Sequence, residues 1–359
     1  MKNTLSLAFV FVIGGIIFPC HAETHYATGV SAEGGWFDCN KAYNPEAFSY
    51  VENGLKPNTT ALANYFPHTD EYMCWAASSS NILEYMNAQK GNTTVYSSSY
   101  NTSSGNSKVD AILRSRAQYE SYYKFLEYCN DDGGNAVDGI CWYATGDEAY
   151  NYGSGTALSY KDPLNMGGGY FQDIVGSDGT TFRNQYVSTF YQFYGQGYAG
   201  DYQLNNIQNQ NTTYTNLFSQ SLASGPIALS INTMDEGNNF LNGHAITCWG
   251  YETDANGVIS SIFITDSDDG MEILRTLTVS QNAYGYLTLS ENETYQSFYY
   301  DENGDSTGYY SNISYADDGY VLTSLASFNN FYPALVPEAS TVSLSLLGIA
   351  GLLLRRKKD

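Results

Sequence analysis

The chain has 359 residues and a formal net charge of −22, because 37 Asp and Glu residues outnumber 15 Lys and Arg residues. Such an acidic chain is a poor partner for nucleic acid, whose affinity for proteins depends largely on Lys and Arg displacing counterions. Its hydrophobic content of 43% and its 34 tyrosines also separate it from disordered acidic chains, which lack the apolar side chains that offset the entropy of ordering. We therefore expect a folded protein that does not bind nucleic acid.

The amino terminus has the pattern of a secretory signal peptide over residues 1–22. Lys2 is followed by an apolar run from Leu5 to Phe18, and the segment ends at the small residue Ala22. Exported proteins carry a positive charge, an apolar core and a small-residue cleavage site in this order. We therefore expect cleavage after Ala22 and export from the cytoplasm.

The carboxyl terminus, residues 336–359, has the pattern of a second targeting segment. A short motif at 336–340 precedes an apolar stretch and the four basic residues 355–358. The stretch has about 13 residues, whereas a membrane-spanning helix needs about 20. This order resembles the PEP-CTERM sorting signal of Gram-negative bacteria, with Ala339 in place of a motif proline. The resemblance implies sorting machinery as a partner, transient membrane association and display at the cell surface or release; a tail anchor retained in the inner membrane is the alternative.

Between these termini, residues 23–335 are expected to form one domain, because no internal repeat divides them. Helix patterns come first and strand patterns later, which predicts an α+β fold. The predicted helices are Cys74 to Gln89, with Asp70 at its start and Gly91 at its exit, Lys108 to Tyr128, and Thr215 to Ala223. The predicted strands are Ile227 to Ile231, Ala245 to Tyr251, Val258 to Thr265 and Leu274 to Val279.

His244 is the histidine best placed for acid–base chemistry, because it begins an apolar strand pattern. The segment turns near Ala255 and returns to Asp266 as a predicted β-hairpin. His244 and Asp266 are equally far from Ala255, so they become cross-strand neighbours about 5 Å apart at Cβ, with Asp268 on the same face. A register shift of one residue would turn Asp266 to the other face. The alternative for residues 266–270 is a solvated acidic turn or a weak cation loop.

Cys74 is the candidate nucleophile, because it opens the predicted helix. The amino terminus of a helix favours a thiolate over a thiol, and its N–H groups can bind an oxyanion. The small residues 76–80 allow another layer to approach closely. A buried structural cysteine or a disulfide partner is the alternative.

The number of cysteines is consistent with a reactive Cys74. Loss of Cys20 with the signal peptide leaves five cysteines, and an odd number in an exported protein leaves one thiol outside intramolecular disulfides. A pairing that leaves out Cys74 joins Cys129 to Cys141, and Cys39 to Cys248. We state this pairing as a hypothesis.

Three segments contain these candidate residues. They are 34–44 (Gly-Gly-Trp-Phe-Asp-Cys-Asn-Lys-Ala-Tyr-Asn), 73–83 beginning Met-Cys-Trp-Ala-Ala, and 242–268 from Asn-Gly-His-Ala-Ile to Asp-Ser-Asp, with weaker similarity at 161–171. Over about residues 34–330 the chain resembles the IdeS/Mac immunoglobulin-degrading cysteine endopeptidases. The resemblance implies a papain-like α+β fold, in which the catalytic cysteine begins a helix packed against an antiparallel sheet that carries the histidine and aspartate.

The resemblance also implies roles for individual residues. Cys74 would be the nucleophile, His244 the base and then the acid, and Asp266 the residue that orients His244. Asp268 would support the site, and Lys41 would help to stabilise the oxyanion, with a solvated surface charge as the alternative for Lys41. This chain departs from the family by having 32 residues between Lys41 and Cys74, which implies an insertion around 45–69. The chemistry requires no metal or organic cofactor.

The expected function is that of a secreted or surface-sorted cysteine endopeptidase. It would hydrolyse an extracellular protein through a thioester acyl-enzyme, and the resemblance implies an immunoglobulin-like substrate. One alternative is a non-catalytic extracellular binding module, because Tyr, Ser, Gly and Asn are also abundant at adaptable binding surfaces. Another is an acyl-transferring or amide-cleaving enzyme with the same Cys-His-Asp site.

Overall fold

The structure, a computed structural model, describes residues 22–41, 72–94, 119–130, 132–147, 158–162, 164–193, 210–234, 240–268, 272–282, 287–291, 296–300, 306–311 and 320–333. Several features expected from the sequence lie outside these residues. They are residues 1–21 of the predicted signal peptide, the predicted insertion at 45–69, the predicted helix cap Asp70 and the predicted sorting segment 336–359. Within the described residues, no helix combines the length and apolar character needed to cross a membrane.

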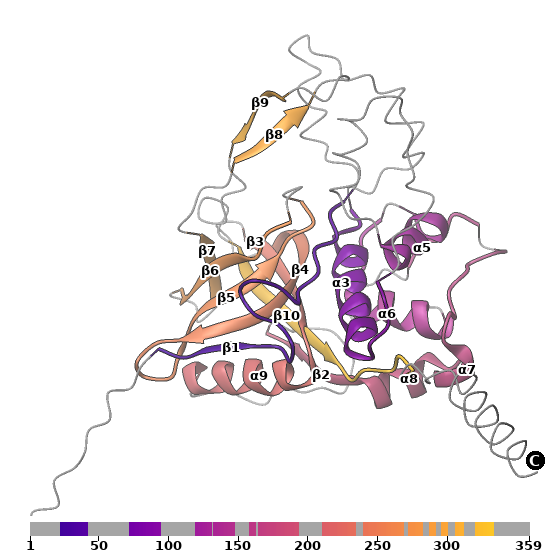
Figure 1. Cartoon of the computed structure of the whole chain (residues 1–359), viewed down its shortest axis with the longest axis horizontal. Helices are drawn as coiled ribbons and strands as arrows, with labels where there is room; N and C mark the ends of the chain where they lie inside the picture. Colours follow the sequence, from indigo (N-terminus) through magenta and orange to yellow (C-terminus); the bar gives the residue numbers. More distant parts are fainter. Residues whose placement is uncertain are drawn as a thin grey trace, which may run out of the picture.

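The dominant feature of the described chain is a closed antiparallel β-barrel of six strands (Figure 1). Hydrogen bonds join the strands in the order β4-β3-β10-β7-β6-β5, and β5 pairs again with β4. The strands of the ring are β3 (Ile227–Met234), β4 (Phe240–Thr253), β5 (Ile259–Thr265), β6 (Arg275–Gln281), β7 (Leu287–Glu291) and β10 (Val321–Phe328). β1 (Thr24–Tyr26) pairs with β4, β2 (Val187–Gln192) pairs with β10, and β8 (Gln296–Tyr300) and β9 (Ser306–Ser311) form a separate pair.

This barrel corrects the papain-like fold, a helix packed on an antiparallel sheet, that the sequence resemblance implied. Four of the six strands, β3 to β6, were predicted near their observed positions, but β7, β10 and the pairing that closes the ring were not. Closure occurs where Val321 of β10 pairs with Thr288 of β7, and the Leu289 N–H donates to the Tyr320 carbonyl at 3.0 Å. Strand twist and β-bulges curl a sheet until its edges meet, and β4 has two such irregularities in its pairing with β5.

Helix α3 (Cys74–Gln89) has the bounds predicted from the sequence. Its first turn closes when the Ala76 and Ala77 N–H groups donate to the Met73 carbonyl at 3.0 and 3.1 Å. It ends at Gln89, and Gly91, two residues later, has a φ of 76°, which suits a residue without Cβ. Nearly all of the helix is buried, including the hydroxyls of residues 78–80, so α3 is a central helix that must satisfy its polar groups internally.

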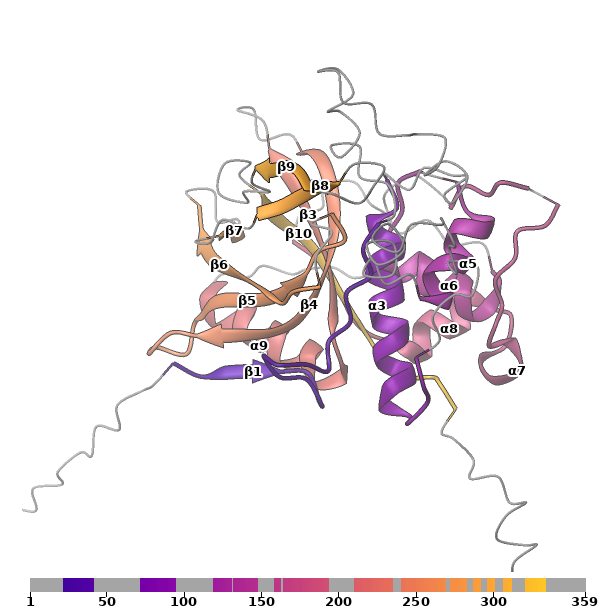
Figure 2. The same ribbon diagram turned by 45° about the horizontal axis from the view of Figure 1, so that its top comes forward.

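The other helices are α5 (Glu120–Tyr128), α6 (Ala136–Thr145), α7 (Gln172–Val175), α8 (Gly179–Tyr186) and α9 (Gln210–Ser224). Helices α3 and α5 to α8 gather beside the barrel, whereas α9 packs on its strands (Figures 1 and 2). Gly139 brings α6 close to α3, because a Cβ there would lie 2.6 Å from the Ser79 hydroxyl and 2.9 Å from the Trp75 ring. Since α3 also packs on β4, its first residue lies where the helical layer meets the barrel.

The register of the β4–β5 hairpin differs from the predicted one. Thr247 pairs with Thr265 and Cys248 with Ile264, which is two residues away from the predicted alignment in this part of the hairpin. The hairpin turn is centred beyond Ala255, and Gly257 has a φ of 75°. Because side chains alternate with a period of two, a shift of two residues leaves each side chain on its original face. The prediction that His244 and Asp266 lie on the same face of the hairpin is therefore correct, although the predicted register was wrong.

The two predicted disulfides are also corrected. Cys129, Cys141 and Cys248 are thiols in the described chain, so neither the Cys129–Cys141 nor the Cys39–Cys248 bridge is present. The Cys248 sulfhydryl donates to the Gly250 carbonyl at 3.2 Å instead. The odd number of cysteines therefore does not single out Cys74, and its distinction rests on its surroundings.

Candidate active site

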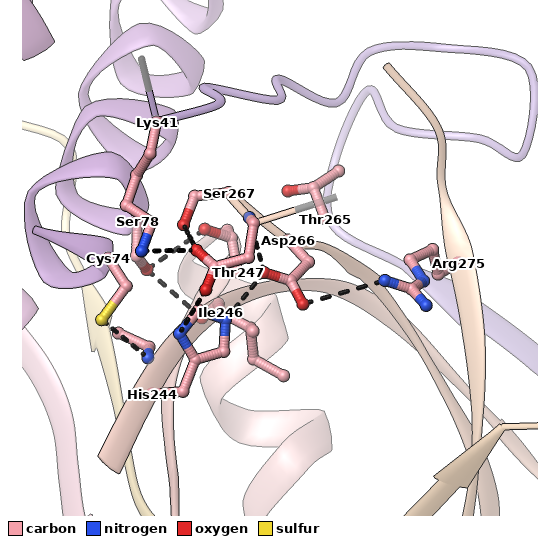
Figure 3. Close-up of polar contacts among 12 residues, drawn as sticks. Lys41, Cys74, Ser78, His244, Ile246, Thr247, Thr265, Asp266, Ser267 and Arg275 are labelled. Carbon is pink, nitrogen blue, oxygen red and sulfur yellow. Dashed lines mark hydrogen bonds and ion pairs between the residues drawn. The ribbon is translucent and has the colours of Figure 1, made fainter. Parts of the chain in front are cut away.

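Three elements bring Cys74, His244 and Asp266 together (Figure 3). Cys74 is the first residue of α3, His244 lies in β4, and Asp266 follows the last residue of β5. His244 Nε2 lies 2.7 Å from Asp266 Oδ1, and the Cys74 sulfur accepts a hydrogen bond at 3.3 Å from the backbone N–H of Ala245, the residue after His244. Because Nε2 faces Asp266, Nδ1 is the ring nitrogen available to the thiol. The arrangement matches a nucleophile, a base and a residue that orients the base.

The electrostatics of the site favour a thiolate beside an imidazolium. Desolvation by the surrounding protein alone would raise the pKa of the Cys74 thiol, but its interaction with His244 and the positive charges of His244 and Lys41 bring that pKa below its ordinary value. Desolvation alone would lower the pKa of His244, but Asp266 and Asp268 raise it well above its ordinary value. By contrast, burial raises the pKa of Cys248 to about 12. Cys74 thus differs from Cys248 both in the direction of its pKa shift and in being only partly buried.

Lys41 and Asp268 form the second part of the site. Lys41 Nζ lies 2.8 Å from Asp268 Oδ1, and the Lys41 side chain is 7% exposed. Its backbone N–H donates to the Ser267 carbonyl at 2.9 Å, which attaches its segment to the end of β5. Asp268 Oδ2 also lies 3.9 Å from His244 Nδ1. The structure thus brings all five predicted site residues into one cluster.

A buried polar network holds α3 against the strands below the site. Asn81 donates to the hydroxyls of Thr247 on β4 and Thr265 on β5 at 3.1 and 3.3 Å. Its carbonyl oxygen accepts from the Cys39 N–H at 2.7 Å. The Ser78 hydroxyl donates to the Ile246 carbonyl at 3.2 Å. These bonds connect the helix of Cys74 to the strands of His244 and Asp266 and to the segment of Lys41, so they fix the relative positions of the reactive groups.

Asp266 has two further contacts, one at the oxygen that faces His244 and one at the other oxygen. Its Oδ1 accepts from the Asp268 N–H at 3.0 Å, and its Oδ2 lies 3.8 Å from Nη1 of Arg275 on β6. Arg275 binds Glu291 of β7 through Nε at 3.0 Å and Nη2 at 2.5 Å. The side chains of Asp266, Arg275 and Glu291 are all buried. A chain of charged groups therefore runs from the barrel interior to His244.

One ligand atom from each of His244, Asp266 and Asp268 lies within 4.8 Å of the others, a spacing that a single cation can bridge. In the observed geometry these atoms already serve other contacts. His244 bonds Asp266, and Lys41 supplies a positive charge to Asp268. These donors fit an ion-pair network, and we do not assign them as metal ligands.

Comparison with known proteins gives a partial match. The Mac 1 family model matches residues 220–314, about a quarter of the chain. The search of curated proteins finds no match. The matched segment includes His244, Asp266 and Asp268 but neither Cys74 nor Lys41.

This result corrects the identification of the chain as an IdeS/Mac-type, papain-like endopeptidase. That identification covered about residues 34–330. The family model matches only residues 220–314, which is too small a part of the chain to assign the chain to the family. The geometry of the site is therefore the main evidence for a function.

The ion pair of Arg275 with Glu291 was not predicted from the sequence, and neither was the role of Asn81 in connecting α3 to the strands. A signal for the ion pair was present. Arg275 alternates with Leu277 and Val279 on the inward face of β6, and Glu291 follows the inward Leu289 of β7. A charged residue at an inward position of a strand requires a partner, so these two positions predict a buried ion pair.

Proposed function

We propose that the protein is an exported cysteine endopeptidase that acts through Cys74, His244 and Asp266. The observation that supports the proposal most strongly is the grouping of Cys74, at the amino terminus of α3, with the bonded pair His244 and Asp266: the pair is 2.7 Å apart, and the N–H of Ala245, next to His244, bonds the Cys74 sulfur at 3.3 Å. A buried structural cysteine needs no acid–base partner, whereas a nucleophile needs a base, and the base needs an orienting group.

In the proposed reaction the Cys74 thiolate attacks the carbonyl carbon of a peptide bond. The His244 imidazolium donates its proton to the leaving nitrogen, so the C–N bond breaks and a thioester forms on Cys74. Neutral His244 then accepts a proton from water, which attacks the thioester; the C–S bond breaks, the acid product is released, and the Cys74 thiolate and the His244 imidazolium are restored. Asp266 stabilises the imidazolium and fixes the ring through its 2.7 Å contact with Nε2.

The oxyanion formed in each step requires nearby donors. The first N–H groups of a helix have no acceptors within the helix, and Cys74 is the first residue of α3. In the proposal, the Cys74 N–H and the positive end of the helix dipole stabilise the oxyanion. Lys41 adds a positive charge that already lowers the pKa of Cys74. Asp268 holds Lys41 in place through the 2.8 Å ion pair.

The proposed substrate is an extracellular protein, because the sequence predicts a signal peptide and a PEP-CTERM-like sorting segment. Cell-surface display or release from a Gram-negative bacterium follows from the same two segments. The net charge of −22 favours substrates with basic rather than acidic patches around the cleaved bond, because opposite charges steer association.

The test is cleavage of a mixture of unfolded extracellular proteins by the purified chain without its terminal targeting segments. New amino termini are labelled and identified by mass spectrometry. We expect new termini with the unmodified protein and with Cys141→Ala, which removes a buried thiol elsewhere, but none with Cys74→Ala. Equal cleavage by Cys74→Ala would refute the mechanism. Absence of cleavage by every form, with a folded protein, would favour the non-catalytic binding module, and ligated products in place of new termini would favour acyl transfer.

A further inference from the structure

Arg275 and Glu291 form a buried ion pair inside the barrel. Arg275 lies on β6 and Glu291 on β7, and the guanidinium contacts the carboxylate through two nitrogens at 3.0 and 2.5 Å. Replacing a buried ion pair by well-packed apolar residues is often neutral or stabilising. The stability of the barrel is therefore a weak explanation for this pair. The position of the pair next to Asp266 points to a role in the site.

The pair lies directly behind the orienting carboxylate of the site. Nη1 of Arg275, the nitrogen not used for Glu291, is 3.8 Å from Asp266 Oδ2. The other oxygen of Asp266 faces His244 Nε2 at 2.7 Å and the Asp268 N–H at 3.0 Å. The two oxygens of Asp266 thus have different neighbours: a guanidinium on one side and the imidazole with a backbone N–H on the other (Figure 3).

We propose that Arg275, held by Glu291, is a positioning residue that keeps Asp266 ionised and turned toward His244. The inference rests on the proposed function, because it assigns Arg275 a part in preparing the Cys74–His244 pair. Arg275 does not touch the reacting atoms, so its effect is transmitted through Asp266.

Two physical effects connect Arg275 to His244. Asp266 is 1% exposed, and burial favours the neutral form of a carboxyl group unless a positive charge compensates it. Arg275 supplies that charge from the side away from His244. An uncompensated guanidinium so near would, however, also oppose a positive charge on His244. Glu291 offsets this effect, so Asp266 retains its attraction for the imidazolium.

The test measures alkylation of Cys74 by iodoacetamide between pH 5 and 9, with quantification of the labelled peptide. Glu291→Gln keeps the shape of the side chain but removes the negative charge that Arg275 binds on β7. The double variant Arg275→Met with Glu291→Met removes the pair without stranding either charge. Asp138→Asn is the matched control, because Asp138 binds a different buried arginine, Arg183, at 3.0 Å in the helical layer.

We expect the midpoint of alkylation to rise by about one pH unit in both Glu291→Gln and the double variant, a tenfold lower thiolate fraction at a given pH below the midpoint. Asp138→Asn should keep the midpoint of the unmodified protein, whatever its effect on thermal stability. A folded Glu291→Gln or double variant with an unchanged midpoint would overturn the positioning role.

His244→Ala, measured in the same series, separates this inference from the proposed function. If the midpoint rises in His244→Ala but not in the Arg275 and Glu291 variants, the positioning role is wrong and the Cys–His pair stands. If His244→Ala leaves the midpoint unchanged, both the pair and the inference fail.

Discussion

Glu84 should make the folded protein less stable as the pH rises. It lies on α3, the helix that positions Cys74, and its side chain is buried. The Ser121 hydroxyl donates to its Oε1 at 2.8 Å, and no salt bridge reaches it from the described residues. Burial raises the pKa of Glu84 from its ordinary 4.5 to about 7. The perturbation we consider is Glu84→Gln, which removes the titratable group and keeps the size of the side chain.

The sign and size follow from linkage. Below pH 4.5 the carboxyl is protonated in the folded and unfolded states, so its titration has no effect on stability. Above pH 7 it is ionised in both, and the folded state carries the full cost of about 3 kcal/mol, at about 1.4 kcal/mol for each unit of pKa shift. The stabilisation by neutral Glu84 is therefore lost as the pH rises through about 4.5 to 7.

Urea unfolding of both proteins at pH 4 and pH 8 measures this effect. The substitution should change the free energy of unfolding at both pH values, and at pH 8 this change should be about 3 kcal/mol more stabilising than at pH 4. An equal difference at the two pH values would refute the reasoning, because it would show that Glu84 titrates alike in the folded and unfolded states.

Three further substitutions test the site. Asp266→Asn removes the charge next to His244. It should reduce turnover at least tenfold and raise the midpoint of Cys74 alkylation by about one pH unit, while the circular dichroism spectrum stays unchanged. Full activity of this variant would exclude the orienting role of Asp266. Lys41→Met should also raise that midpoint, because it removes a positive charge that lowers the pKa of Cys74; an unchanged midpoint would make Lys41 a charge without influence on the thiol. Asn81→Leu should cost about 2 to 4 kcal/mol in urea unfolding, because it strands buried partners of three hydrogen bonds; a loss below about 0.5 kcal/mol would show that the network does not hold α3.

The local elements of the site were predictable because their signals are local. The small residues after Cys74 and the glycine at 91 indicated the bounds of α3, and the apolar run after His244 indicated β4. The helix at 136–145 was not predicted, because it begins directly after the polar, glycine-containing stretch 130–135. Asn135 caps this helix by accepting from the Asp138 N–H at 2.9 Å, a signal that the glycine-rich composition obscured.

The closure of the barrel and the hairpin register depend on interactions that a linear pattern does not contain. The observed pairing of Thr247 with Thr265 differs by two residues from the predicted alignment, and only the even size of this shift kept Asp266 on the face of His244. The contact of β10 with β7 joins strands far apart in the sequence, and no periodicity specifies such a pairing. The predicted disulfides failed for a related reason, since cysteine counts carry no distances.

The most direct test of the account is the pH dependence of Cys74 alkylation in the unmodified protein and in His244→Ala. The account predicts rapid labelling of Cys74 at pH values well below the ordinary thiol pKa of about 8.5, and loss of that reactivity at low pH when His244 is removed. Slow labelling that is indifferent to His244, or recovery of Cys74 in a disulfide, would contradict the claim that these two residues form a catalytic pair.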